Sequence, residues 1–150
     1  MNRLHRNGSS RVFVALAVLL FCAGPAAAAD LAVSVTNVSS KGGDIRLALY
    51  DERSYAGHDG QPIAAVTVTA TSPTTTLTVR GLSPGRYAAK VFQDFDRSGA
   101  FKMNVFGYPE EPFGFSNDAR PLLDQPSFAR ASFEVGRDRQ AITIRLREGL

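Results

Sequence analysis

Apolar and polar residues alternate along seven short stretches of the chain, and this alternation is the strongest signal in the sequence. In "LAVSVTNV", for example, Leu31, Val33 and Val35 fall on one face, and Ser34 and Thr36 fall on the other. A period of two residues with many Val and Thr is typical of β-strands that bury one face and expose the other. The pattern therefore predicts seven strands, within residues 31–38, 45–52, 63–70, 75–81, 85–94, 129–135 and 141–147.

No segment has a convincing helical period, and most predicted strands are joined by short polar or glycine-containing connections. Clean alternation is typical of antiparallel sheets, and two such sheets packed face to face form a sandwich around one core. We therefore predict an all-β fold, a seven-stranded antiparallel β-sandwich of immunoglobulin-like or transthyretin-like type with one long aromatic-rich loop. A small antiparallel barrel is the alternative. The predicted domain is single and covers residues 30–150.

The first 29 residues have a different pattern, in which a basic start precedes an apolar run and a series of alanines. This order is typical of a secretory signal peptide, and we predict cleavage after Ala29 or Ala28. An uncleaved anchor is the alternative, but the apolar run, residues 12–24, is shorter than the roughly 20 residues that a spanning helix needs. The mature chain is therefore expected to be periplasmic or secreted, with no stable membrane insertion.

Removal of this segment changes the charge and the chemistry of the chain. The formal charge of +3 comes from 17 Lys and Arg against 14 Asp and Glu, and the predicted signal contains three of the arginines. The mature chain would hold 14 of each, which gives no reason to expect nucleic acid as a partner. Cys22 lies in the predicted signal, and His58 is the one histidine that follows it. The mature chain therefore offers neither a thiol nucleophile nor the ligands of a zinc site.

The connection from Phe95 to Pro126 is far longer than the usual 4–6 residues and is dense in Phe, Tyr, Gly and Pro. A loop of this kind either forms a functional surface or packs its own side chains as a compact cover. If its aromatic side chains are exposed, they form a binding surface. The residues that we predict for that surface are Phe106, Tyr108, Glu111, Phe113, Phe115 and Asn117.

The start of this connection, "DFDRSG", matches the opening of a calcium-binding loop, because oxygen-bearing side chains alternate before a glycine. The match then fails, since Lys102 and Val105 stand at the ninth and twelfth positions, where a further ligand and a bidentate Glu belong. The pattern predicts weak Ca²⁺ binding by Asp94, Asp96 and Ser98. An Asx-type turn, in which the aspartates bind their own backbone, is the alternative.

Longer stretches of the sequence resemble known families. "GLSPGRYAAKVFQD" resembles a turn and strand of transthyretin-like and carboxypeptidase-regulatory-like sandwiches. The pattern that runs through "GDIRLALYDE", "NVFGYPEEPFGFSNDAR" and "PSFARASFEV" resembles DUF2141, a family of exported bacterial proteins of unknown function. Its most specific part is Asn-x-x-Gly-x-Pro-x-Glu followed by Gly-Phe-Ser-Asn, here Asn104, Gly107, Pro109, Glu111, Gly114, Phe115, Ser116 and Asn117. The resemblance implies a fold and export but no reaction. Where members tend to carry a last Asp in the acidic loop, this chain has Lys102.

Three functions are consistent with these features. The first, which we expect, is an exported non-catalytic binding or accessory module of the cell envelope, with an envelope or extracellular ligand that the sequence does not identify. The second is a metal-assisted enzyme that uses the loop carboxylates Asp94, Asp96 or Glu111. The third is a structural envelope protein in which the aromatic loop is wholly internal. Exposure of the aromatic side chains separates the first function from the third.

Overall fold

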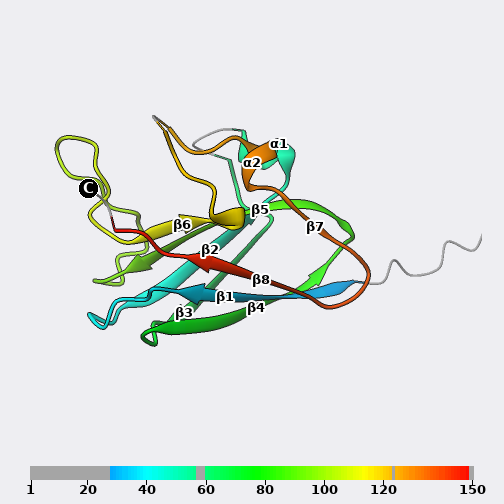
Figure 1. Cartoon of the computed structure of the whole chain (residues 1–150), viewed down its shortest axis with the longest axis horizontal. Coiled ribbons are helices and arrows are strands. Elements are labelled where there is room, and N and C mark those ends of the chain that lie inside the picture. The colour runs from blue at the N-terminus through cyan, green and yellow to red at the C-terminus, as the bar shows by residue number, and fades with distance from the viewer. Residues whose placement is uncertain (1–27, 57–59, 123, 149–150) are drawn as a thin grey trace, which may run out of the picture.

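The computed structural model describes residues 28–56, 60–122 and 124–148 (Figure 1). The predicted signal peptide therefore lies almost wholly outside the described residues, and so does His58. The first strand begins at Ala29, where the predicted cleavage site lies. Within the described ranges, no helix combines the length and the apolar character needed to cross a membrane.

Two β-sheets pack against each other and make the described part of the chain mostly β-structure. The strand order is β4-β1-β8 in the smaller sheet and β3-β2-β5-β6 in the larger one, where β7 also pairs with β5. The strands are β1 (Ala29–Thr36), β2 (Asp44–Tyr50), β3 (Ala64–Thr69), β4 (Thr74–Leu82), β5 (Gly85–Asp94), β6 (Phe113–Phe115), β7 (Phe133–Val135) and β8 (Gln140–Arg145). The helical segments are α1 (Glu52–Tyr55), the 3₁₀ turn η1 (Ser116–Asp118) and α2 (Phe128–Ala131).

The fold differs from the predicted sandwich in three respects. The described residues contain eight strands and not seven, because β6 forms within the segment predicted as one long loop. The stretch 129–135 divides into the end of α2 and the short strand β7. Finally, β1 pairs with β8 in parallel, from Leu31 opposite Gln140 to Thr36 opposite Arg145, so the sheets are not purely antiparallel. Alternation is more typical of antiparallel sheets, but a parallel pair that buries one face alternates in the same way, as β1 and β8 do here.

The core lies between the sheets and consists of the inward residues that alternation predicts. Strands β1 and β2 alternate strictly between buried and half-buried positions. The β3 positions Ala64, Val66 and Val68 are only half-buried, because β3 is an edge strand of its sheet. The buried core residues within the predicted strands include Leu31, Val33, Val35, Ile45, Leu47, Leu49, Leu77, Val79, Tyr87, Ala89, Val91, Val135, Ile144 and Leu146. Burial of each large aliphatic side chain contributes about 1.5–3 kcal/mol.

Strand β6 joins the two sheets along one side. The Phe113 N–H donates to the Arg147 carbonyl at 2.9 Å, and the Arg147 N–H donates back to Phe113 at 2.8 Å. Gly114 allows this close approach, since a Cβ there would lie 2.7 Å from the carbonyl oxygen of Arg145. The contact fixes the far end of the long connection, so that residues 95–112 are held between the end of β5 and the start of β6.

Candidate functional site

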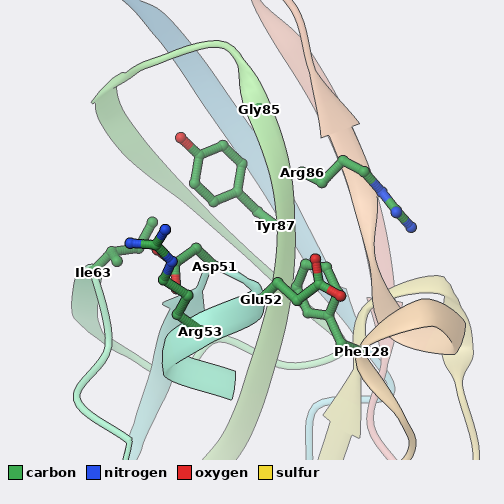
Figure 2. A pocket seen from close by; sticks show the side chains of 8 residues that line it. All are labelled: Asp51, Glu52, Arg53, Ile63, Gly85, Arg86, Tyr87 and Phe128. Atoms are coloured by element: carbon green, nitrogen blue, oxygen red, sulfur yellow. The ribbon is translucent and has the colours of Figure 1, made fainter. Parts of the chain in front are cut away.

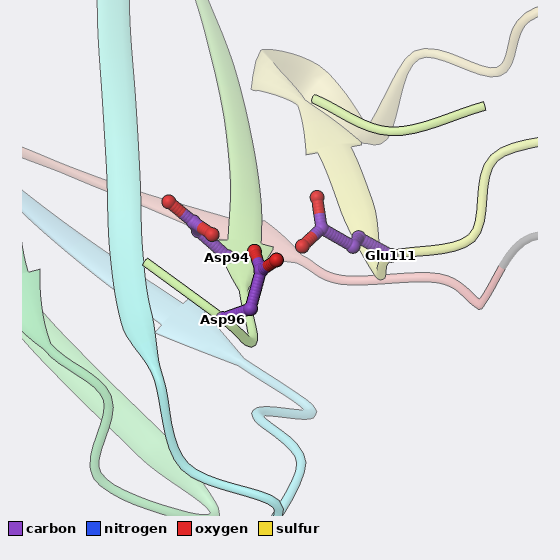
Figure 3. A group of neighbouring side chains, drawn as sticks. All are labelled: Asp94, Asp96 and Glu111. Carbon is purple, nitrogen blue, oxygen red and sulfur yellow. The ribbon is translucent and has the colours of Figure 1, made fainter. Parts of the chain in front are cut away.

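Three carboxylates meet where β5 ends and β6 begins (Figure 3). Asp94 is the last residue of β5, Asp96 follows it, and Glu111 approaches from the segment that precedes β6. One carboxylate oxygen of each lies within 4.8 Å of the others. Asp94 and Glu111 are buried and Asp96 is exposed. We call Asp94, Asp96 and Glu111 the carboxylate cluster. These are the side chains that the sequence offered for metal-assisted chemistry.

Asp94 is held by donors from three directions. Its Oδ2 accepts a hydrogen bond from the Arg46 Nε at 2.6 Å and another from the Gly99 N–H at 2.8 Å. Its Oδ1 accepts from the Ser98 N–H at 3.0 Å. The buried charge of Asp94 is therefore balanced by the guanidinium of Arg46 on the neighbouring strand β2. Burial of a charge is costly without such a partner.

Glu111 and Asp96 are also bound by the protein itself. Glu111 accepts from the backbone N–H of Phe95 at 3.1 Å and that of Lys102 at 3.4 Å. Asp96 accepts from the Ser98 N–H at 3.3 Å and from the ammonium of Lys102. The hydrogen bond from Lys102 lowers the pKa of Asp96 to about 2, and Asp96 in turn raises the pKa of Lys102.

All six oxygens of the carboxylate cluster thus accept a hydrogen bond from the protein. Ser98 contributes its backbone N–H to both aspartates, and its bond to Asp96, two residues earlier, has the spacing of an Asx-type turn. Lys102 places a positive charge beside Asp96, so its ammonium would compete with a cation there. These bonds connect the cluster to the loop that surrounds it.

Beyond the cluster, residues 102–110 fold into a small hairpin. The Asn104 N–H donates to the Tyr108 carbonyl at 2.8 Å, and the Glu110 N–H donates to the Lys102 carbonyl at 3.0 Å. Met103 and Pro109 form an isolated antiparallel bridge. Figure 1 shows this segment as the yellow-green loop that projects at the end of the molecule near the C-terminus.

Asn104 and Gly107 define the turn of the hairpin. The Asn104 Oδ1 accepts from the Phe106 N–H at 2.9 Å and from the Tyr108 N–H at 3.1 Å. The Gly107 N–H donates to the Asn104 carbonyl at 2.9 Å. Gly107 has φ of +80°, which a residue with a side chain rarely adopts. One asparagine side chain and one glycine therefore fix the backbone of an exposed turn, and Asn-x-x-Gly is its local sequence signal.

The side chains that this turn displays are apolar. Val105 is 94% exposed and Phe106 is 80% exposed, and Met103 and Tyr108 are exposed beside them. We call Met103, Val105, Phe106 and Tyr108 the apolar tip. Phe106 and Tyr108 belong to the binding surface predicted from the sequence, whereas Met103 and Val105 were not among its residues. Large apolar side chains gathered at one exposed place often mark an interaction site.

The other predicted surface residues are packed or hydrogen-bonded. Phe115 is buried and Phe113 is half-buried, and their rings stack edge to face at 6.0 Å. Phe113 also contacts Phe101, which contacts Phe92, so that a row of rings covers β5. The predicted aromatic loop therefore divides into an exposed tip and a packed part.

Asn117 is exposed, and it and its neighbours connect elements. The Asn117 Nδ2 donates to the Ser132 carbonyl at 2.7 Å, and Asn117 has φ of +56°. Ser116 is buried, accepts from the Ala89 N–H at 2.8 Å and donates to the Ala131 carbonyl at 2.6 Å. The motif Gly-Phe-Ser-Asn thus ties β6 to β5 and to α2.

A groove lies near the opposite end of β5, and the sequence analysis did not predict it (Figure 2). It is an open groove of about 820 Å³ between α1, the start of β5 and α2. Its side chains come from four separate segments, so no local pattern could have revealed it. Asp51 caps α1, and the Arg86 Nη2 donates to the Ser132 Oγ at 2.6 Å. The lining residues are Asp51, Glu52, Arg53, Ile63, Gly85, Arg86, Tyr87 and Phe128.

The fold and the site define a small β-sandwich that carries one ordered, projecting loop. The chain belongs to the family DUF2141, described as an uncharacterized protein conserved in bacteria, whose pattern it matches over residues 33–143. The match covers most of the chain and confirms the resemblance read from the motifs. Comparison with curated proteins and with solved structures gave no match. The family description supports a bacterial context and names no reaction.

Proposed function

We propose that this chain is an exported, non-catalytic binding or accessory module of the cell envelope, and that the apolar tip is its working surface. One observation carries the proposal: a hydrogen-bonded turn holds Val105 and Phe106 in water, where they have no packing role within the described domain. An ordered loop loses less conformational freedom on binding than a flexible one does. The turn is therefore suited to present the same side chains to a partner repeatedly.

The two alternative functions fit the contacts less well. An enzyme that recruits a metal would bring the ion beside the Arg46 guanidinium and the Lys102 ammonium, which already pair with Asp94 and Asp96. A purely structural protein needs an internal loop, and Val105 and Phe106 of that loop are both largely exposed. Phe113 and Phe115 are the part of the aromatic loop that packs internally and has a structural role.

The experiment is affinity capture from the native envelope fraction with matched variants. The wild-type chain is compared with the double variant Val105→Ser, Phe106→Ser and with Leu122→Ser, which removes an equally exposed apolar side chain outside the tip. We expect the double variant to retain about tenfold less of whatever the wild type retains, and Leu122→Ser to retain as much as the wild type. Equal retention by all three chains, each with unchanged thermal unfolding, would contradict the proposal.

A further inference from the structure

We infer that the apolar tip binds the surface of a phospholipid bilayer by shallow insertion of Val105 and Phe106 among the acyl chains. The inference rests on the proposed function and names the chemistry of the ligand. Of the seven large apolar residues that are exposed in the described ranges, five lie between Phe101 and Tyr108. Four of these five form the apolar tip, on the hairpin that projects from one end of the molecule (Figure 1). A fluid hydrocarbon layer accepts a projecting apolar loop without needing a preformed pocket.

The hairpin carries no charge over its whole apolar stretch. The segment "MNVFGYP", from Met103 to Pro109, contains no Asp, Glu, Lys or Arg. Its two polar side chains are Asn104, whose oxygen is bound within the turn, and Tyr108. Tyrosine is favoured where hydrocarbon meets the headgroups, because its ring is apolar and its hydroxyl remains hydrated. Insertion to the level of Tyr108 would therefore leave no charged side chain in hydrocarbon.

Part of the backbone of the tip is hydrogen-bonded internally, which favours burial in lipid. The N–H groups of Asn104, Phe106, Gly107 and Tyr108 donate to acceptors within the hairpin. In hydrocarbon no water is present, and each unpaired backbone group opposes insertion. These four bonds therefore lower the cost of moving the turn out of water.

A pocket in a protein partner is the other dry environment, and the tip fits it less well. Protein interfaces combine aromatic anchors with about one hydrogen bond for every 100–200 Å², made by polar groups around the anchor. The tip offers few groups for such bonds, because four of its turn N–H groups and the Asn104 oxygen are already bound and residues 103–109 include no charged side chain. This scarcity of polar side chains favours lipid over protein.

The charges around the base of the hairpin show no excess of positive charge. Lys41, Glu110 and Glu148 line a groove of about 420 Å³ that also touches Asn104 and Pro109 of the hairpin. Lys102 is paired with Asp96. Proteins that depend on anionic lipids carry a net excess of Lys and Arg at the membrane. This end has no such excess, so apolar contact with zwitterionic phospholipid drives the binding.

The test uses vesicles of phosphatidylcholine and phosphatidylethanolamine. The chain contains no Trp, so Phe106→Trp creates a single tryptophan at the tip. We expect its emission to shift to shorter wavelength on addition of vesicles and to be quenched by lipids brominated along the acyl chains. In co-sedimentation, the double variant Val105→Ser, Phe106→Ser should bind about tenfold less than wild type, and Leu122→Ser should bind within about twofold of it.

Two further measurements distinguish apolar binding from electrostatic binding, and lipid from a protein partner. Added phosphatidylglycerol and a change from low to high salt should leave the affinity within about twofold, because no basic excess is involved. Failure of the wild type to sediment with vesicles, or equal binding by the double variant, overturns the inference. If the vesicles fail while the tip variants still lose capture from the envelope fraction, the partner is a protein and the proposed function stands. If neither experiment depends on the tip, both proposals are wrong.

Discussion

At the scale of single residues, Lys102 supplies one of the two positive charges that lie beside the carboxylate cluster. Its ammonium contacts Asp96, while its backbone N–H donates to Glu111. In the sequence pattern of calcium loops, this position supplies a ligand for the ion. Here the side chain brings its own positive charge, and Arg46 does the same for Asp94. The three negative charges are therefore offset by two covalently attached positive charges.

This arrangement predicts how calcium affects stability. We expect the wild-type melting temperature to be the same in millimolar Ca²⁺ and in chelator, because Lys102 competes with the ion. Lys102→Asp replaces that charge by a carboxylate, and its melting temperature should be about 4 °C higher in Ca²⁺ than in chelator. Lys41→Asp makes the same charge change outside the cluster and should show no difference. A Ca²⁺-dependent wild type would favour the weak calcium site predicted from the sequence.

At the scale of elements, the turn before β2 lies directly against the end of β5. Gly42 and Gly43 both have positive φ, of +79° and +85°. A Cβ on Gly43 would lie 2.2 Å from the Asp94 carbonyl oxygen, whereas a Cβ on Gly42 would meet no atom within 4 Å. Gln93 ties the same turn to β5 through bonds to Ser39 and Gly42. The contact between this turn and the end of β5 fixes the backbone position of Asp94, the first residue of the carboxylate cluster.

The two glycines give a matched pair for a stability measurement. Gly42→Ala should lower the free energy of unfolding by about 1–2 kcal/mol, the cost of positive φ alone. Gly43→Ala should cost at least about 2 kcal/mol more, because the backbone of β5 must also shift. Denaturant unfolding of both variants measures the difference. Equal costs would show that the turn and the end of β5 do not pack as closely as described.

The elements also show which parts of the fold could be predicted from the sequence. Alternation predicted β1, β2 and β4 well, because their side chains largely alternate between the core and the surface. It also predicted β5, although Tyr87, Ala88 and Ala89 of that strand are buried in a continuous run. It missed β6, which has three residues and depends on pairing with β5 and on the bridge to Arg147. Parallel pairing of β1 with β8 was also missed, since both directions bury the same residues.

The site was predictable in the same local sense. "DFDRSG" gave Asp94 and Asp96 as neighbours, but how closely Glu111 approaches them depends on the path of a segment of about fifteen residues. Phe106 and Phe115 are the same residue type in similar surroundings of Gly and Pro. One is exposed because Asn104 and Gly107 turn the chain outward, and the other is buried because β6 pairs with β5. Tertiary contacts separate them, and residue type does not.

At the scale of the whole molecule, a second apolar cluster joins α1 and α2 to the larger sheet. Tyr55 is buried in it, donates to the Pro126 carbonyl at 2.9 Å and contacts the rings of Tyr50 and Phe128. The Lys90 ammonium lies 4.6 Å from the centre of the Tyr55 ring. This cluster holds the segment after η1 against the sheet, at the opposite end of β5 from the tip.

Burial of Tyr55 makes stability depend on pH in alkaline solution. Desolvation, followed by the nearby Tyr50, raises the pKa of Tyr55 from 10.0 to about 12. A raised pKa in the folded state stabilises the fold below pH 10, and this contribution is lost as pH rises from 10 towards 12. We expect unfolding free energy to fall by roughly 2 kcal/mol over that range from this group. Burial raises the pKa of Tyr50 and Tyr87 in the same direction.

Tyr55→Phe isolates the contribution of this hydroxyl. The variant should be about 1 kcal/mol less stable at neutral pH, because the bond to Pro126 is lost, and its stability should fall less steeply above pH 10. Tyr108→Phe removes an exposed hydroxyl and serves as the control. Denaturant unfolding at several pH values gives the slopes, and an unchanged slope for Tyr55→Phe would place the ionising group elsewhere.

The central claim is that the apolar tip is the surface that meets the partner, whether lipid or protein. Cys22 is the one cysteine of the chain and lies in the predicted signal, so a single cysteine can be placed and labelled in the mature domain. An environment-sensitive dye at Val105→Cys is compared with the same dye at Thr143→Cys, an exposed position on β8. On addition of the native envelope fraction, we predict a shift of emission to shorter wavelength at position 105 and none at position 143. A shift at 143 alone, or at neither position, would contradict the claim.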